Sequence, residues 1–333
     1  MHLRALFVGT VLSAAPLPLL GQSGSIDPQC GAATVSQRAT QDACQKAIDT
    51  FQYLAPQLGI AITGGSATLG QGIAFGKLGQ FSIGMRANVL PGRVPRVDLV
   101  SPSPLGATQT NYRVDDRVLG LPTIDAALGV FPGIRMGPGG LKVLAVDALA
   151  NLAYIPDVAQ SNVTITAPDG SLKLGFGGRV GIIQESGLTP GLGVSFLRRD
   201  LPRVDVVAQV NDDQLAVRSI DVESQAWRVM LQKSLKPITF VVGAGRDRYN
   251  TAATAEVEVS VAGNVFRSSD ISATQRLDRD NIFADVAWNL AMFRLAGEIG
   301  YVRGGAIDPY NQFGSSRADQ AHSYGSLGIR LSF

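Results

Sequence analysis

The residues that could carry catalysis are few in this chain. His2 and His322 are its two histidines, and Ser323 follows His322 directly. A serine or an aspartate beside a histidine can hydrolyse lipids or peptides when the two side chains face each other and a third group orients the base. Neighbouring residues of a strand point to opposite faces, so His322 and Ser323 do not make such a pair. No sequence motif indicates another nucleophile, and we predict that the protein is not an enzyme.

Cofactor, metal and nucleic-acid sites are not indicated either. Gly64-Gly65 and the stretch 137–140 lack the Lys-Ser/Thr pair of a phosphate-binding loop. The acidic runs 211–213 and 278–280 could hold calcium, but turn-forming and solvated roles are commoner for such runs. The formal net charge of +2 gives no electrostatic reason for a nucleic-acid partner. We therefore predict no cofactor, no metal and no nucleic acid.

The two cysteines, Cys30 and Cys44, are close together in the sequence. Their spacing is not that of a metal site, and no histidine is near them. In an oxidising compartment, a disulfide between them would close a short loop and stabilise the fold by about 3 kcal/mol in the chain-entropy model. We predict this disulfide, with two free thiols as the alternative.

The N-terminus indicates export to such a compartment. Arg4 precedes the apolar run Ala5–Leu12, and the small residue Gly21 follows a stretch rich in Ala, Pro and Leu. This order is typical of a secretory signal peptide. The apolar run is too short to cross a bilayer, which takes about 20 apolar residues. We predict a signal peptide at residues 1–21, with an N-terminal anchor helix as the alternative.

The C-terminus carries the most specific pattern. Leu327, Ile329, Leu331 and Phe333 alternate strictly with small or polar residues, and the aromatic residue is the last one. This segment resembles the closing strand of bacterial outer-membrane β-barrels. The resemblance implies that the barrel-assembly machinery of the outer membrane reads these four residues as an insertion signal. It also implies that the protein is located in the outer membrane, in contact with its lipid.

The rest of the chain agrees with a strand-built membrane protein. Charged residues make up 17% of the sequence and 38 residues are glycine, and such a composition is unusual for a soluble enzyme. A transmembrane strand needs about 9–11 residues that alternate between a lipid-facing and a lumen-facing position. Ten segments fit this pattern: Gln80–Leu90, Leu119–Val130, Leu141–Tyr154, Ser171–Gln184, Gly191–Arg199, Ala226–Leu235, Ile238–Arg246, Asn281–Leu290, Met292–Val302 and the C-terminal strand.

The connections between these segments alternate between short and long, which is typical of an up-and-down barrel. We therefore predict an all-β fold, a closed antiparallel barrel over residues 57–333. The number of strands stays open between 10 and 14. The Gly-rich stretch 58–79 could add a hairpin, and alternations within 199–225 and 248–280 are either hairpins above the membrane or further spanning strands. Leu141–Tyr154 also fits a helix, and a soluble β-sandwich remains an alternative for the whole chain.

Residues 22–56 precede the predicted barrel. Apolar residues recur at helical spacing from Ala32 to Tyr53, and we expect Pro56 to end that helix. The helix is interpreted either as a periplasmic segment beneath the barrel or as a plug in its lumen.

Charged residues at lumen-facing positions are the candidate functional site. Strand parity directs ten of them inward: Arg86, Asp125, Asp147, Lys173, Arg179, Arg228, Asp285, Arg294, Glu298 and Arg330. One interpretation is a network of ion pairs that holds the barrel shut. The other is a polar, mildly cationic path for anionic or amphipathic solutes.

The general plan, an N-terminal extension before a barrel, is similar to that of the long-chain fatty-acid transporters of outer membranes. The chain has no Asn-Pro-Ala stretch of the kind that family carries, and it is short for that family's fourteen strands. We predict passive transport of a small solute through the lumen. The alternative is a non-conducting barrel, either structural or acting in surface interactions through its long extracellular loops.

Overall fold

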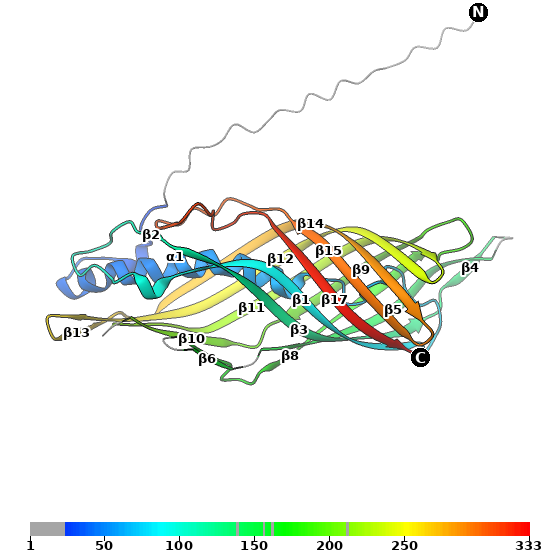
Figure 1. The fold of residues 1–333 in the computed structure, drawn as a ribbon, viewed down its shortest axis with the longest axis horizontal. Helices are drawn as coiled ribbons and strands as arrows, with labels where there is room; N and C mark the ends of the chain where they lie inside the picture. Colours follow the sequence, from blue (N-terminus) through cyan, green and yellow to red (C-terminus); the bar gives the residue numbers. More distant parts are fainter. Residues whose placement is uncertain (1–23, 138–139, 156, 161–162, 211–212) are drawn as a thin grey trace, which may run out of the picture.

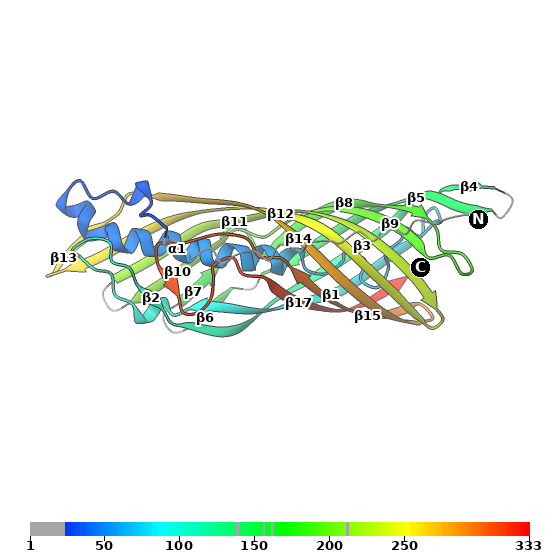
Figure 2. The ribbon, with the colours of Figure 1, turned by 90° about the horizontal axis from the view of Figure 1, so that it is seen from above.

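A computed structural model describes residues 24–137, 140–155, 157–160, 163–210 and 213–333. The predicted signal peptide lies outside these residues. Ten long strands form one closed barrel, in which strands adjacent in the sequence pair antiparallel and β17 pairs with β1 (Figures 1 and 2). Their bounds are Phe81–Pro95 (β1), Val114–Phe131 (β3), Leu141–Tyr154 (β5), Leu172–Ile183 (β8), Gly191–Asp200 (β9), Asp213–Leu235 (β11), Ile238–Val261 (β12), Ile271–Leu290 (β14), Phe293–Val302 (β15) and His322–Ser332 (β17).

The remaining elements are short. Four strands extend the sheet beyond β11 or β12, one pairs with β5, and two form a separate parallel pair. Their bounds, with those of two single-turn helices, are Val158–Gln160 (β6), Val163–Thr166 (β7), Val204–Val210 (β10), Asn264–Arg267 (β13), Ile134–Met136 (β4), Asn111–Tyr112 (β2), Gln312–Phe313 (β16), Pro28–Cys30 (η1) and Val97–Leu99 (η2). The alternations within 199–225 and 248–280 therefore extend the barrel wall and add no spanning strand.

The barrel has an apolar outer face. Met85, Phe176 and Leu327 are more than 60% exposed, and each belongs to a strand whose alternate residues are buried in the lumen. An apolar exterior with a polar interior is the pattern that lipid requires of a closed sheet, which leaves no backbone group unpaired. The closed antiparallel barrel is confirmed. A β-sandwich is excluded because the sheet closes on itself through the pairing of β1 with β17.

The two ends of the barrel differ. Strands β11, β12 and β14 have 23, 24 and 20 residues and extend well past their neighbours at one end, which we call the long-loop end. At the other end, short turns connect the strands and the chain reaches Phe333, so we call it the C-terminal end (Figure 1). Leu141–Tyr154, which also fitted a helix, is strand β5.

Helix α1 (Val35–Thr63) lies inside the barrel and begins at the long-loop end (Figures 1 and 2). The interpretation of this helix as a segment beneath the barrel is therefore wrong. Thr34 and Gln37 form a capping box at its start. None of the described helices is long and apolar enough to cross a membrane.

Pro56 lies within helix α1, so the expectation that it would end the helix is wrong. A proline removes the hydrogen bond to the carbonyl four residues earlier, which here is that of Gln52. The Nε2 of Gln275 on β14 donates to this carbonyl instead, at 3.3 Å. Because the barrel wall satisfies the orphaned group, the helix continues to Thr63.

Residues 64–80 connect the helix to β1 without any strand, so the hairpin considered for 58–79 does not form. This stretch, which we call the lumen segment, runs along the interior of the barrel towards the C-terminal end. The barrel itself begins at Phe81, well after residue 57.

Candidate functional site in the barrel lumen

One face of helix α1 packs against β11, β12 and β14 at the long-loop end, where these strands extend past the apolar band, the lipid-facing part of the barrel. Cys44, Ala47 and Ile48 contact a cluster that includes Ala255 and Val257 of β12. Farther along, Phe51 and Ala55 pack on Ala253 and Ala273 in the same way. The small residues let the helix approach the wall closely, and the cluster forms an apolar core inside the long-loop end.

The opposite face of the helix carries two buried aspartates that hold the loop between β1 and β3 and the loop between β15 and β17. Asp42 pairs with Lys46 and accepts from the backbone nitrogens of Ser103 at 2.6 Å and Thr108 at 2.8 Å. Carboxylates that accept several N–H groups make strong, charge-assisted hydrogen bonds. The loop 96–113 is therefore tied to the helix.

Asp49, seven residues further on, binds the loop between β15 and β17. It accepts from the backbone nitrogen of Asn311 at 2.8 Å and from its Nδ2 at 2.6 Å. Burial raises the pKa of Asp49, and the hydrogen bonds from Asn311 oppose this increase. Tyr53 follows on the same face, and its ring stacks on Phe313 at 4.2 Å between centroids. The two loops therefore close over the helix.

We expect Asp49→Ala to release this loop without opening the barrel. The backbone nitrogen of Asn311 would lose its acceptor, which costs about 1–3 kcal/mol locally. Trypsin should then cleave the folded protein after Arg317 several times faster than it cleaves the wild type. Asp308→Ala, in an exposed position of the same loop, is the matched control and should leave the cleavage rate unchanged. Equal rates for all three proteins would contradict the anchoring role of Asp49.

Three arginines of the wall meet at the C-terminus of the helix. Arg86 of β1 donates to the carbonyl of Gly64 at 2.5 Å, Arg199 of β9 to those of Ile62 and Thr63 at 2.9 and 3.0 Å. Arg228 of β11 also donates to the Thr63 carbonyl, at 3.2 Å. A helix C-terminus carries unpaired carbonyls and a partial negative charge, which cations stabilise. The wall thus caps the helix.

The lumen segment is held by its backbone. Wall side chains accept from four of its N–H groups: Ser66 to Glu298 (2.9 Å), Gly70 to Asp285 (3.3 Å), Gly72 to Gln232 (2.9 Å) and Phe75 to Asp147 (3.1 Å). Arg179 donates to the Gln71 carbonyl at 2.7 Å, and Arg294 and Arg330 donate to the Gln71 Oε1. Because five of these bonds, the four from N–H groups and the one to the Gln71 carbonyl, use main-chain groups, the wall replaces the partner strand that the segment lacks.

The lumen charges also pair with one another. Arg86 bonds to Asp125 at 2.9 Å, and Arg179 bonds to Asp147 at 2.5 Å with both side chains fully buried. Arg228 pairs with Asp247 of β12. Asp285 and Glu298, by contrast, are two acids opposite each other in the β14–β15 register, and each accepts from a backbone nitrogen of the lumen segment. Lys173 is half-buried at the long-loop end of β8, and it forms no ion pair with any described residue.

Little space remains around these groups. A void beside Ala67 and Arg199 and another beside Leu69 and Arg330 have volumes of about 10 Å³ each. A cavity needs at least that volume to hold one water molecule. Side chains and the lumen segment therefore fill the barrel at the level of both voids.

Sequence reasoning missed several lumen residues that bind helix α1, the lumen segment or their partners, among them Asn88, Arg199, Gln232 and Asp247. Asn88 and Gln232 were at inward positions of predicted strands but carry no charge. Arg199 ended a predicted strand, and Asp247 was just past the predicted end at Arg246. Strand parity continued past those ends would have placed both of them inside.

The other candidate residues lie elsewhere. Cys30 and Cys44 form a disulfide that ties the segment before the helix to its third turn. Leu327, Ile329, Leu331 and Phe333 lie at the outer face or the rim of the C-terminal end. His322 is buried and Ser323 is exposed on the opposite face. Among the described residues, no group of three His, Cys, Asp or Glu side chains could hold a metal ion.

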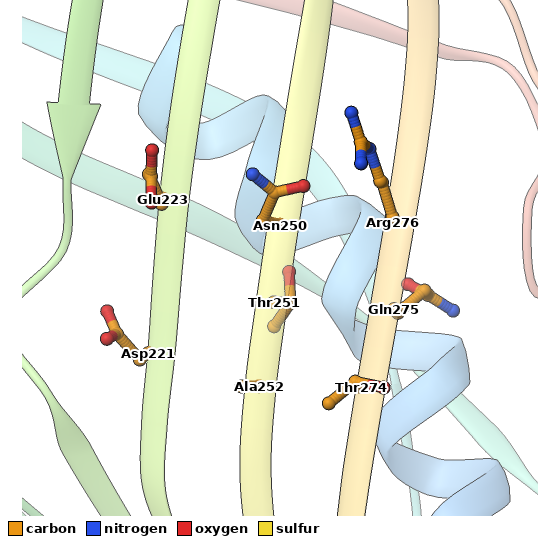
Figure 3. Close-up of a pocket in the computed structure, with 8 residues that line it drawn as sticks. All are labelled: Asp221, Glu223, Asn250, Thr251, Ala252, Thr274, Gln275 and Arg276. Carbon is orange, nitrogen blue, oxygen red and sulfur yellow. The ribbon is translucent and has the colours of Figure 1, made fainter.

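A polar hollow of about 310 Å³ lies where β11, β12 and β14 extend past the apolar band. Asp221, Glu223, Asn250 and Arg276 are among the side chains that line it, and helix α1 passes behind the three strands (Figure 3). The hollow faces away from the lumen, and a salt bridge from Arg198 already engages Glu223 at 3.0 Å. It is therefore separate from the lumen site.

Comparison with known proteins does not identify a family for this chain. No family model and no curated protein matches the chain. Among solved structures, it is similar to the translocator domain of the autotransporter NalP from Neisseria meningitidis, at 11% identity and a TM-score of 0.41, covering 91% of this chain and 100% of that one. The transport unit of the autotransporter AIDA-I from Escherichia coli matches at 8% identity and a TM-score of 0.33, covering 87% and 99%.

The toluene transporter TbuX from Ralstonia pickettii matches at 14% identity and a TM-score of 0.27, covering 82% of this chain and 92% of that one. All of these TM-scores are below 0.5, so the likenesses carry no argument about this chain. By its own structure, the protein is a closed antiparallel β-barrel with an apolar outer face and an N-terminal helix inside it.

Proposed function

We propose that the protein is a non-conducting barrel whose long-loop end acts as an interaction surface outside the cell. The observation that carries this proposal is the lumen segment, whose backbone is hydrogen-bonded to side chains of the wall. Passive transport of a solute would require this segment to leave, and with it the bonds to Glu298, Gln232 and Arg179. Removing them would leave buried polar groups of the wall without hydrogen-bond partners, at about 1–3 kcal/mol each.

The arrangement of the two barrel ends supports this orientation of the protein in the membrane, with the long-loop end outside the cell. A signal peptide delivers the chain to the periplasm, and we infer that the assembly machinery there reads the exposed residues Leu327, Ile329 and Phe333. The C-terminal end then faces the periplasm. The long-loop end faces outward, where the two tied loops and the start of the helix form one surface. Gly24, whose nitrogen donates to the Pro309 carbonyl at 3.3 Å, places the N-terminal part of the described chain at this surface.

Single-channel conductance in planar bilayers tests the proposal. We expect the mature protein to be silent, and a variant that lacks residues 24–79 to conduct. Deletion of 24–56 alone should change little, because the end of the helix and the lumen segment remain in the wall's hydrogen bonds. Heat-modifiable gel mobility would confirm that each barrel is folded. Steady conductance of the full mature protein would instead support transport past the plug.

A further inference from the structure

The C-terminal end of the barrel carries an uneven distribution of charge. The cations in its turns and at the end of the lumen segment are Lys77, Arg135, Lys142, Lys233 and Lys236. The one acidic side chain among the described turn residues there is Glu185, and it bonds to Ser234 and pairs with Lys233 at 3.4 Å. The other four cations have no acidic partner among the described residues.

Three of these cations lie together. Arg135 of β4 and Lys142 of β5 are directly opposite each other in the hairpin register. The Nζ of Lys142 donates to the Gly76 carbonyl at 2.7 Å, which places Lys77 of the lumen segment beside this hairpin. Like charges at opposite positions of a ladder repel each other, so folding alone does not account for the cluster. Binding of an anion from outside the protein would account for it.

The same hairpin has an apolar face. Ile134 and Met136 are 50% and 58% exposed, and in the register they pair with Val143 and Leu141 of β5. Leu128 on the adjoining strand β3 and Leu144 farther along β5 are also exposed on the outside of the barrel. The apolar face of the hairpin therefore continues the lipid-facing band past the rim, and β4 reaches farthest at this end (Figures 1 and 2).

We propose that Arg135 and Lys142 of this hairpin, together with Lys77, form a binding site for the headgroups of anionic phospholipids. An element with an apolar face towards lipid and cations on its other face lies at the membrane interface, where each cation contributes about 1 kcal/mol of attraction to anionic lipid. In the orientation proposed above, the lipid is that of the periplasmic leaflet. The lipid site does not depend on whether the lumen conducts. Conductance of the mature protein would therefore contradict the proposed function but not this site.

The test uses the full mature protein in vesicles of phosphatidylethanolamine and phosphatidylglycerol in equal amounts, followed by native mass spectrometry of the lipids that stay bound. We expect the wild type to retain phosphatidylglycerol in preference to phosphatidylethanolamine. In the triple variant Lys77→Gln, Arg135→Gln, Lys142→Gln, this preference should decrease by roughly fivefold for each cation removed, at low ionic strength. The preference of the wild type should also decrease in 0.5 M salt, where charges are screened beyond about 4 Å.

A matched control removes three exposed cations from the long-loop end: Arg38→Gln, Arg113→Gln and Arg317→Gln. This variant should retain phosphatidylglycerol as the wild type does. Equal retention of both lipids by the wild type would overturn the proposal, and so would an equal loss in the two variants. All six side chains are outside the core, and gel mobility would show that both variants are folded.

Discussion

Asp147→Asn is expected to destabilise the folded barrel by about 3–5 kcal/mol, because it leaves the guanidinium of Arg179 buried without its counter-charge. Both side chains have 0% exposure, and the carboxylate also accepts from the Phe75 nitrogen of the lumen segment. The loss would therefore affect the wall and the plug together. Denaturant unfolding from lipid vesicles, followed by the fluorescence of Trp227 and Trp288, measures the difference in the free energy of unfolding.

Two further variants define what the result means. The double variant Asp147→Leu with Arg179→Met removes both charges and should recover part of the loss, since an apolar pair of similar size replaces the ion pair. Arg218→Gln breaks an exposed pair with Glu256, in which each side chain is 43% exposed, and should cost less than about 1 kcal/mol. If Asp147→Asn also cost less than that, the lumen would be wet and the filled interior described above would be wrong.

The strands could be predicted from the sequence because lipid and a polar lumen impose a strict alternation on each of them. In β12 the outward apolar residues Phe240, Val242 and Ala244 have even numbers. Between Ala244 and Ala253 the apolar set moves to odd numbers, and Val257 and Val259 are buried. The apolar residues of β12 therefore change from the outer to the inner face of the barrel. The change marks the level above which lipid no longer covers the outer face and the helix packs against the inner face.

The same change occurs in β14, where the apolar set moves from Ile271 and Ala273 inside to Ile282 and Ala284 outside. From the sequence, every alternating segment is a possible membrane-spanning strand, so the predicted number of strands ranges up to fourteen. Comparing the parity of the apolar residues along each strand would have distinguished the membrane level from the extension, and would have given ten.

The position of the helix could not be predicted from its own residues. Helix α1 has apolar residues on one face and Asp42, Asp49 and Tyr53 on another, which suits the surface of a domain as well as a mixed lumen. What places it inside is the set of partners spread over the chain: Ser103, Asn311 and Gln275 for its polar groups, and the long strands for its apolar face. No local pattern reveals such partners, of which Asn311 and Gln275 are more than 200 residues from the helix groups that they bind.

Gly70→Ala is expected to destabilise the protein by about 3 kcal/mol, of which about 1–2 kcal/mol comes from the backbone and the rest from overpacking. Gly70 has a φ of +75°, where a side chain is strained. A Cβ at this position would also be 2.4 Å from the Cβ of Ala287 and 2.9 Å from that of Ala296, both in the wall. The free energy of unfolding and amide exchange of residues 64–79 measure the effect.

Gly79→Ala is the matched control. Gly79 has a φ of +73° and a Cβ there would meet nothing within 4 Å, so the backbone strain is the same and the steric cost is absent. It should therefore cost about 1–2 kcal/mol. A larger loss at Gly70 than at Gly79, with faster exchange in the lumen segment, would show that the segment packs tightly against the wall. Equal losses would mean that the segment can move away from β14 and β15, and a lumen that yields so easily could open to solutes.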